Sequence, residues 1–181
     1  TAKALWYIYF GLTIACGVAY YYAGMGSFDA LCHAFSTVSI GGFSTHDASM
    51  GYFNNTLINS IAIFFMFVAG VNFSLHFVAW RGKSLAGYPT DSEFRAYAKN
   101  LIALSIAVIV YLLVAGEYDT LKEAINEGLF QVVSIATTTG FTTTNFSAWS
   151  GAIPVLLIFA SFIGGCAGST GGGMKVMRCL L

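Results

Sequence analysis

Two glycine-containing loops rich in hydroxyl side chains carry the groups that could do chemistry in this sequence. The first reads TVSIGGF over residues 37–43, and the second reads ATTTGF over residues 136–141. Backbone carbonyls, supplemented by Thr or Ser hydroxyls, can replace the hydration oxygens of a potassium ion without holding it too tightly. A glycine in each loop permits the unusual dihedral angles that point successive carbonyls the same way. The two loops therefore have the composition of an ion-selectivity filter.

Both loops belong to a segment that occurs twice in the chain. Residues 27–47 and 125–145 align without a gap, and each copy follows one hydrophobic stretch and precedes another. Such repeats are weighed first because missing them misassigns the whole fold. One loop of this kind is weak evidence, whereas two at matching places are strong evidence. The pattern is typical of a pore loop, and since two loops cannot encircle an ion, we expect further copies to complete the pore.

The composition places the chain in a lipid bilayer. Hydrophobic residues make up 57% and charged residues only 9%, against roughly 25% charged in soluble domains. The net charge is zero and no basic run occurs, which argues against a nucleic-acid partner. No signal peptide is recognisable, and both ends stop abruptly. We therefore expect an interior piece of a longer membrane protein.

Four stretches are apolar enough to cross a bilayer, which takes roughly 20 residues in a helix. They are residues 4–23, 56–80, 96–115 and 149–163. Pro154 falls in the first turns of the fourth stretch, where proline is tolerated. This last span then gives way to a Gly-rich run, residues 164–173, and is predicted to be broken near mid-membrane.

Two half-helices are predicted between the spans. One covers residues 28–37 with Ser27 as its cap, and the other covers residues 121–136 behind a capping box of Thr120 and Glu123. Both end where a filter-like loop begins. Non-helical backbone at membrane depth is tolerated only when it is buried in protein or lines a water-filled cavity. The sequence thus predicts helix, half-helix, loop and helix, used twice.

Charged residues set the expected orientation. The loop at residues 81–99 holds four of the eight basic residues, Arg81, Lys83, Arg95 and Lys99, and Lys175 and Arg178 follow the broken helix. By the positive-inside rule this side is cytoplasmic. The outer side, which includes Asp47 and residues 117–122, carries six of the eight acids against Lys122 alone. An acidic outer mouth raises the local concentration of cations.

The Gly-rich break admits two interpretations. Gly164, Gly168 and Gly172 form a small-xxx-small series, which could serve close helix packing. Alternatively, the unwound stretch lies under the filter and gates it, because ten polar or tiny residues cost a membrane helix much of its backbone bonding. The repeat offset supports the second interpretation, since residues 69–72 of the second span match residues 167–170.

Several polar side chains within the predicted spans and loops have expected roles. Asn72 and His76 either make polar contacts between helices or line the pore. His33 is predicted to be a hydrogen-bonding strut behind the filter, and His46 and Asp47 are placed at the mouth. The three histidines have no metal-site spacing.

These motifs resemble the Trk/Ktr/HKT superfamily of potassium transporters, most closely its TrkH type. The resemblance covers essentially the whole chain and is carried by STVSIGGFSTHD, SIATTTGFTTTNFSAWSG and FIGGCAGSTGGGMK, of which the last is the most specific. Members of the family place four non-identical helix–pore-loop–helix repeats around one pore. The chain looks like repeats two and three, divided as residues 1–95, with a cytoplasmic loop at about 81–95, and residues 96–181.

The resemblance also implies site residues and partners. It places filter carbonyls at Ser39, Ile40, Gly41, Gly42, Thr137, Thr138, Thr139 and Gly140. It places an intramembrane gate at Gly164, Gly165, Gly168, Ser169, Thr170, Gly171, Gly172, Gly173 and Lys175. The family pattern has one filter glycine per repeat, so Gly41 is an extra one, replaced by Thr139 in the second copy. Members form homodimers and pair with a cytosolic nucleotide-binding regulator of the TrkA type.

The prediction is an all-α integral membrane protein with two of an expected four pore-loop repeats. It carries potassium ions into a bacterium across the inner membrane, surrounded by lipid, and is not an enzyme. Sodium or ammonium permeation by the same architecture is the alternative within transport, and channel-like flow and symport both stay open. An intramembrane hydrolase built on Ser39 or Ser169 lacks an acid to orient its base. A scaffold without a pore leaves the repeated loops unexplained.

Overall fold

The computed structural model describes residues 2–180, which form helices and connecting loops with no strand in that range. Helices α1 (Ala2–Tyr22) and α6 (Ser92–Val114) are each long and apolar enough to cross a membrane. They correspond to the first and third predicted spans. Helix α6 begins earlier than predicted because the Asp91 carboxylate accepts a 2.7 Å hydrogen bond from the Phe94 amide and caps the helix there.

The second predicted span, residues 56–80, is not a continuous helix, and that expectation was wrong. Helix α3 (Thr56–Ala69) and helix α4 (Phe73–Gly82) meet at an angle of 93°. Gly70 ends α3, and the Asn72 side chain starts α4 by accepting a 2.8 Å hydrogen bond from the Ser74 amide. Because an Asn cap favours a new helix start, the hydrophobic run bends even though its hydropathy is uninterrupted.

Both half-helices are present. Helix α7 (Leu121–Ala136) has the predicted bounds, and the Thr120 hydroxyl accepts a 3.2 Å bond from the Glu123 amide as its cap. Helix α2 (Ser27–Val38) is one residue longer at each end than predicted. The capping role predicted for Ser27 was wrong, since Gly26 occupies the cap position without a side-chain bond and Ser27 is already helical.

The fourth span is broken as predicted. Helix α8 (Ile153–Ile163) carries Pro154 in its first turn, and helix α9 (Val176–Leu180) resumes after a non-helical stretch. We call residues 164–175 the unwound loop. Because this loop is not helical, Gly164, Gly168 and Gly172 do not share a helix face, and the small-xxx-small interpretation was wrong.

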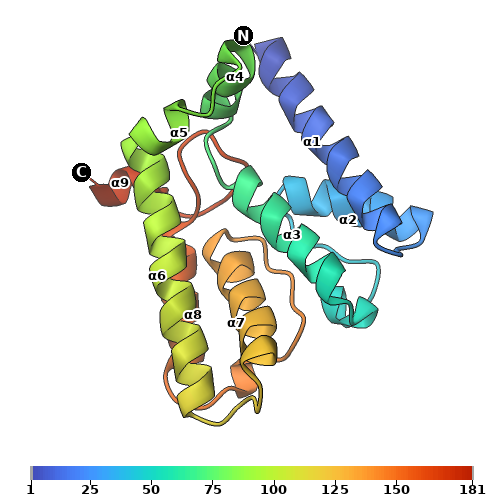
Figure 1. The fold of residues 1–181 in the computed structure, drawn as a ribbon, viewed down its shortest axis with the longest axis vertical. Coiled ribbons are helices and arrows are strands. Elements are labelled where there is room, and N and C mark those ends of the chain that lie inside the picture. The colour runs from blue at the N-terminus through green and yellow to red at the C-terminus, as the bar shows by residue number, and fades with distance from the viewer. Residues whose placement is uncertain (1, 181) are drawn as a thin grey trace.

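The two copies pack against each other chiefly through the second half-helix, α7 (Figure 1). Helix α7 lies against α3 of the first copy and against α6 and α8 of its own copy. One buried cluster joins α1, α2 and α3 to Phe130, Val133 and Phe141 of the second copy. The start of α1, helix α4, helix α5 (Gly87–Thr90) and helix α9 lie toward one end of the molecule. The short 3-10 helices η1 (Ser49–Phe53) and η2 (Phe146–Ala148) follow the two filter-like loops.

Candidate ion-conduction site

The backbone conformation of the two filter-like loops is the same in both copies. Ile40 and Gly42 have φ angles of 56° and 69°, and the matching Thr138 and Gly140 have φ angles of 71° and 88°. The residue between each pair does not have positive φ. Alternation of this kind turns successive carbonyl groups to one side of the chain. Ile40 and Thr138 are β-branched, for which positive φ is an outlier that costs about 1–3 kcal/mol and marks functional sites.

The amide groups of the loops point back toward the half-helices. The Gly41 and Thr139 amides each donate a 2.8 Å hydrogen bond, to the carbonyls of Ser36 and Ser134 respectively. Within residues 2–180, no hydrogen bond reaches a carbonyl oxygen of residues 39–42 or 137–140. All eight predicted filter carbonyls are thus free to bind an ion. The C-terminal ends of α2 and α7, which carry negative dipole charge, adjoin them and favour a cation.

Buried polar side chains hold the loops from behind. His33 is fully buried, with Nδ1 2.8 Å from the Asp29 carbonyl oxygen and Nε2 2.9 Å from the Ser44 hydroxyl. At the equivalent place Gln131 donates a 3.1 Å bond to the Thr144 carbonyl. Both contacts tie a half-helix to the chain that leaves its filter, as the strut predicted for His33 requires.

The N-terminal turns of the half-helices are linked to the chain after each filter-like loop by matching acid–hydroxyl pairs. Thr45 donates a 2.7 Å hydrogen bond to the Asp29 carboxylate, and Thr143 donates one to Glu127. His46 Nε2 also lies 3.3 Å from the Asp29 carboxylate, and its role at a pore mouth stays a prediction. The Thr45 bond, followed by His46, holds the pKa of Asp29 below its ordinary value of 3.8.

The unwound loop lies against the end of α2, next to the first filter-like loop, and against the second filter-like loop. The Thr170 hydroxyl donates a 2.8 Å bond to the Val38 carbonyl, at the end of α2. The Gly172 amide donates a 2.7 Å bond to the Thr138 hydroxyl, in the second filter. Across the loop, the Lys175 ammonium donates to the Gly171 carbonyl. Two predicted gate residues, Thr170 and Gly172, are thereby placed beside the predicted filters.

The remaining predicted gate residues shape the base of the loop. Gly164, Gly168 and Gly173 have φ angles of 71°, 74° and 75°, which favour glycine. A Cβ on Gly165 would lie 2.9 Å from the Gly70 carbonyl, so the two broken spans touch at this point. The Ser169 hydroxyl donates a 2.6 Å bond to the Cys166 carbonyl and thus stabilises the turn.

Asn72 and His76 prove to be packing residues. Asn72 caps α4, and His76 bridges the Tyr88 hydroxyl at 2.7 Å and the Val68 carbonyl at 3.0 Å. Both therefore stabilise the break between α3 and α4. These contacts favour the packing interpretation of the two left open by the sequence.

Two residues at the start of α6 were missed by sequence reasoning. Glu93 is buried and accepts hydrogen bonds from the amides of Ala167 and Met177, and buried Tyr97 donates a 3.1 Å bond to the Phe67 carbonyl. The one signal in the sequence is that Glu93, like Asp91, is an acid on a side of the chain where basic residues predominate.

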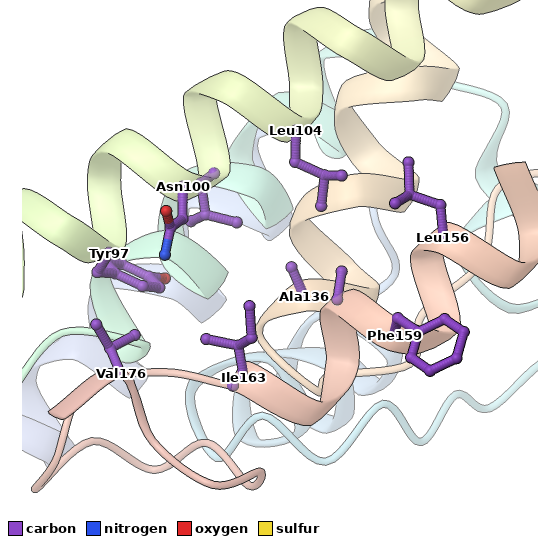
Figure 2. Close-up of a pocket in the computed structure, with 11 residues that line it drawn as sticks. Tyr97, Asn100, Leu104, Ala136, Leu156, Phe159, Ile163 and Val176 are labelled. Atoms are coloured by element: carbon purple, nitrogen blue, oxygen red, sulfur yellow. The ribbon is translucent and has the colours of Figure 1, made fainter. Parts of the chain in front are cut away.

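An apolar cavity of about 280 Å³ borders the unwound loop (Figure 2). The cavity is partly open to the surface and lies between α6, the end of α7, α8 and the start of α9. Its lining includes Tyr97, Leu104, Ala136, Phe159, Ile163 and Val176. Ile163 and Val176 flank the loop, so both of its ends adjoin unfilled space.

The fold uses the order helix, half-helix, filter-like loop and helix twice, and the last helix of the second copy is unwound. This arrangement defines a membrane protein of the pore-loop class. The family model described as TrkH, cation transport protein, matches residues 1–181. The chain therefore belongs to the TrkH family.

Named relatives agree with this assignment over the whole chain. The Trk system potassium uptake protein TrkH of Vibrio parahaemolyticus is 55% identical over 183 residues, covering 100% of this chain and 38% of the relative. TrkH of Halomonas elongata is 54% identical over 181 residues, with 100% and 37% covered. The crystal structure of the potassium transporter TrkH from Vibrio parahaemolyticus superimposes with a TM-score of 0.96 at 55% identity, over 99% of this chain and 39% of that one. The chain thus spans under two-fifths of the length of these relatives.

Proposed function

We propose that this chain supplies two of the four repeats of a potassium-uptake protein of the bacterial inner membrane. The observation that carries the proposal is the pair of loops with alternating positive φ and eight free carbonyls. Carbonyl oxygens of this kind replace the hydration shell of potassium. Relatives that match the whole chain are named as potassium uptake proteins. The division into residues 1–95 and 96–181 is part of this proposal.

In the proposed filter, the ion binds to backbone carbonyls of residues 39–42 and 137–140, and equivalent residues of two further repeats complete the ring. The half-helix ends contribute negative potential without a formal charge, which holds the ion weakly enough for it to leave. Gly42 and Gly140 are needed because their φ angles are positive.

The unwound loop is the proposed gate. Its contacts with the end of α2 through Thr170 and with Thr138 through Gly172 support a position across the route by which an ion would leave the filter. Its glycines allow it to change conformation at low cost, and the cavity beside Ile163 and Val176 provides space for its ends to move.

The orientation and the partners are also proposals. Arg81 lies in α4, Lys83 directly follows α4, and Arg95 and Lys99 lie in the first turns of α6. Helices α4 and α5 and the start of α6 lie toward one end of the molecule (Figure 1), and the basic residues favour a cytoplasmic location for that end. Asp47 and residues 117–122 then face outward. A homodimer and a TrkA-type cytosolic regulator follow from the family resemblance, and a regulator would approach the basic end. Channel-like flow and symport both remain compatible with a carbonyl filter.

The rival functions receive less support. Ser39 and Ser169 both donate their hydroxyl to backbone carbonyls, at 3.3 and 2.6 Å, and neither contacts a histidine as a nucleophile in a hydrolase would. Transport of sodium or ammonium in place of potassium is distinguished by the uptake experiment described next.

The test uses the full-length protein in liposomes. Uptake of potassium, sodium and ammonium is measured separately under the same gradient. We expect potassium uptake to exceed the other two. If sodium or ammonium is taken up as fast as potassium or faster, the proposal that potassium is the substrate is wrong. If none of the three ions is taken up, the proposal of a conducting filter is contradicted.

A further inference from the structure

Glu93 is an unusual residue for its place in the fold. It lies in the first turn of α6, a helix long and apolar enough to cross a membrane, and its side chain is only 3% exposed. A buried carboxylate is costly unless hydrogen bonds or an opposite charge compensate it. No lysine, arginine or histidine of residues 2–180 lies within ion-pair distance of it. Its direct partners are therefore hydrogen-bond donors, and the Lys175 ammonium acts on it only from a longer distance.

Those hydrogen bonds come from both ends of the unwound loop. The Glu93 Oε1 atom accepts a 2.6 Å bond from the Ala167 amide, near the start of the loop. The same oxygen accepts a 3.1 Å bond from the Met177 amide, in the first turn of α9 just past the loop. The donors are 74 and 84 residues away in sequence, so one carboxylate oxygen clamps two distant points.

The two Glu93 hydrogen bonds reinforce the base of the unwound loop, where its two ends meet. The Val176 amide donates a 3.1 Å bond to the Gly165 carbonyl, which closes the loop on itself. The Cys166 amide donates a 2.8 Å bond to the Gly70 carbonyl, which ties the loop to the break between α3 and α4. Both Cys166 and Val176 are buried, as a fixed base requires.

Helix α6 also holds the other break. Tyr97 lies four residues after Glu93, on the same helix face, and donates to the Phe67 carbonyl in the last turn of α3. A Cβ on Gly70 would collide with the Tyr97 hydroxyl, so the tyrosine fits closely against the bend. One face of α6 thus contacts the broken spans of both repeats.

We propose that Glu93 is a positioning residue that anchors the base of the unwound loop and thereby holds the loop against the filter. It acts through the Ala167 and Met177 amides and does not touch the ion. This inference rests on the proposed gating role of the loop. Loss of the anchor should free the loop base while leaving the filter carbonyls, and hence ion preference, unchanged.

The anchor is tested by the reactivity of Cys166, which is fully covered at the loop base. Full-length protein in which every other cysteine is serine is labelled with N-ethylmaleimide in membranes. Glu93→Ala should raise the labelling rate by about fivefold or more, because local opening exposes the thiol. Glu123→Ala is the matched control, an exposed acid in the first turn of α7, far from the loop. The inference is overturned if Glu93→Ala labels at the parental rate.

A second variant guards against failure to fold. Glu93→Gln keeps the shape and one oxygen acceptor but loses the charge that makes such bonds roughly twice as strong. Its labelling rate should lie between those of the parent and Glu93→Ala. A parental labelling rate in both variants overturns the anchor. If Glu93→Ala does not accumulate, a parental labelling rate in Glu93→Gln alone overturns it.

Potassium flux then separates the anchor from the gate. Where labelling of Glu93→Ala rises, basal potassium flux in liposomes should also rise, with the potassium-to-sodium ratio unchanged. Raised labelling without raised flux would leave the anchor in place and overturn the gating role of the loop. If Glu93 had only a structural role, Glu93→Ala would lower the potassium flux together with the amount of folded protein.

Discussion

The α-carbon of Gly42 in the first filter faces the carbonyl oxygen of Thr139 in the second filter. A Cβ on Gly42 would collide with that oxygen and would also lie 2.9 Å from the Thr139 carbonyl carbon. The two predicted filters are therefore in direct contact, and the position of one depends on the other. This contact joins residues 97 positions apart and explains why the first filter needs a glycine here beyond its positive φ.

Gly42→Ala is expected to abolish most potassium uptake. The added methyl group displaces the Thr139 carbonyl, and the positive φ adds about 1–2 kcal/mol of strain, which alone is a factor of about ten. Uptake by the full-length protein in liposomes is the measurement. Gly41→Ala is the matched control, because Gly41 does not have positive φ and its nearest neighbour is the flexible Ser39 hydroxyl at 3.1 Å. Equal uptake by the two variants would contradict the contact.

Gly70→Ala is expected to destabilise the bend between α3 and α4. Its methyl group collides with the Tyr97 hydroxyl, and overpacking of this kind costs about 1–3 kcal/mol. The thermal unfolding temperature of the solubilised protein should fall. Tyr97→Phe removes the colliding oxygen, so the double variant should recover part of the loss relative to the sum of the single variants. Strict additivity would show that the collision does not occur.

Thr170→Val is expected to loosen the unwound loop. The change keeps the shape but removes the bond to the Val38 carbonyl, worth about 0.5–1.5 kcal/mol. If that bond holds the loop under the filter, basal potassium flux rises by about two- to tenfold. Ser161→Ala removes an exposed hydroxyl from α8, outside the loop, and serves as the control. A lower flux in Thr170→Val with normal protein amount would argue that the loop does not obstruct the ion.

Thr45→Val is expected to change how stability depends on acid pH. The Asp29 carboxylate has a lowered pKa in the folded protein, chiefly because of the Thr45 hydroxyl. Its contribution to stability is therefore present above pH 3.8 and is lost as the pH falls through the pKa of Asp29 in the folded protein. The variant should be less stable than the parent at pH 6, and this difference should shrink toward about pH 3.

The unfolding temperature measured across this pH range tests the pairing of Thr45 with Asp29. Thr144→Val, whose hydroxyl has no hydrogen bond within residues 2–180, should leave the acid profile unchanged. A constant difference between the Thr45→Val variant and the parent at all pH values would contradict the pairing.

Local signals were sufficient to predict the repeated architecture. The Thr120 cap fixes the start of α7, and the hydroxyl-rich loops follow directly from the half-helices in both copies. The break of the second span was missed because its hydropathy is continuous, although Gly70 and Asn72 were aligned with the broken region of the fourth span. An Asn followed by Ser74 is a weak start signal when apolar residues surround it.

Long-range contacts could not be predicted in the same way. Glu93 gains its role only when residues 167 and 177 are brought to it by the fold. Phe43 and Phe141 occupy equivalent positions, yet Phe43 is 82% exposed and Phe141 is fully buried against the first copy. A repeated sequence motif does not reveal which residues will pack against each of its copies.

The central claim, that residues 137–140 form part of a selectivity filter, is tested most directly with Gly140→Ser. Gly140 has a φ of 88° and no atom within 4 Å of a Cβ position, so the substitution strains the backbone without displacing a neighbour. The measurement is growth of an uptake-deficient bacterial strain that expresses the full-length protein. At normal protein levels, we predict failure to grow at low potassium or new sensitivity to sodium. Unchanged growth and ion preference would contradict the filter assignment.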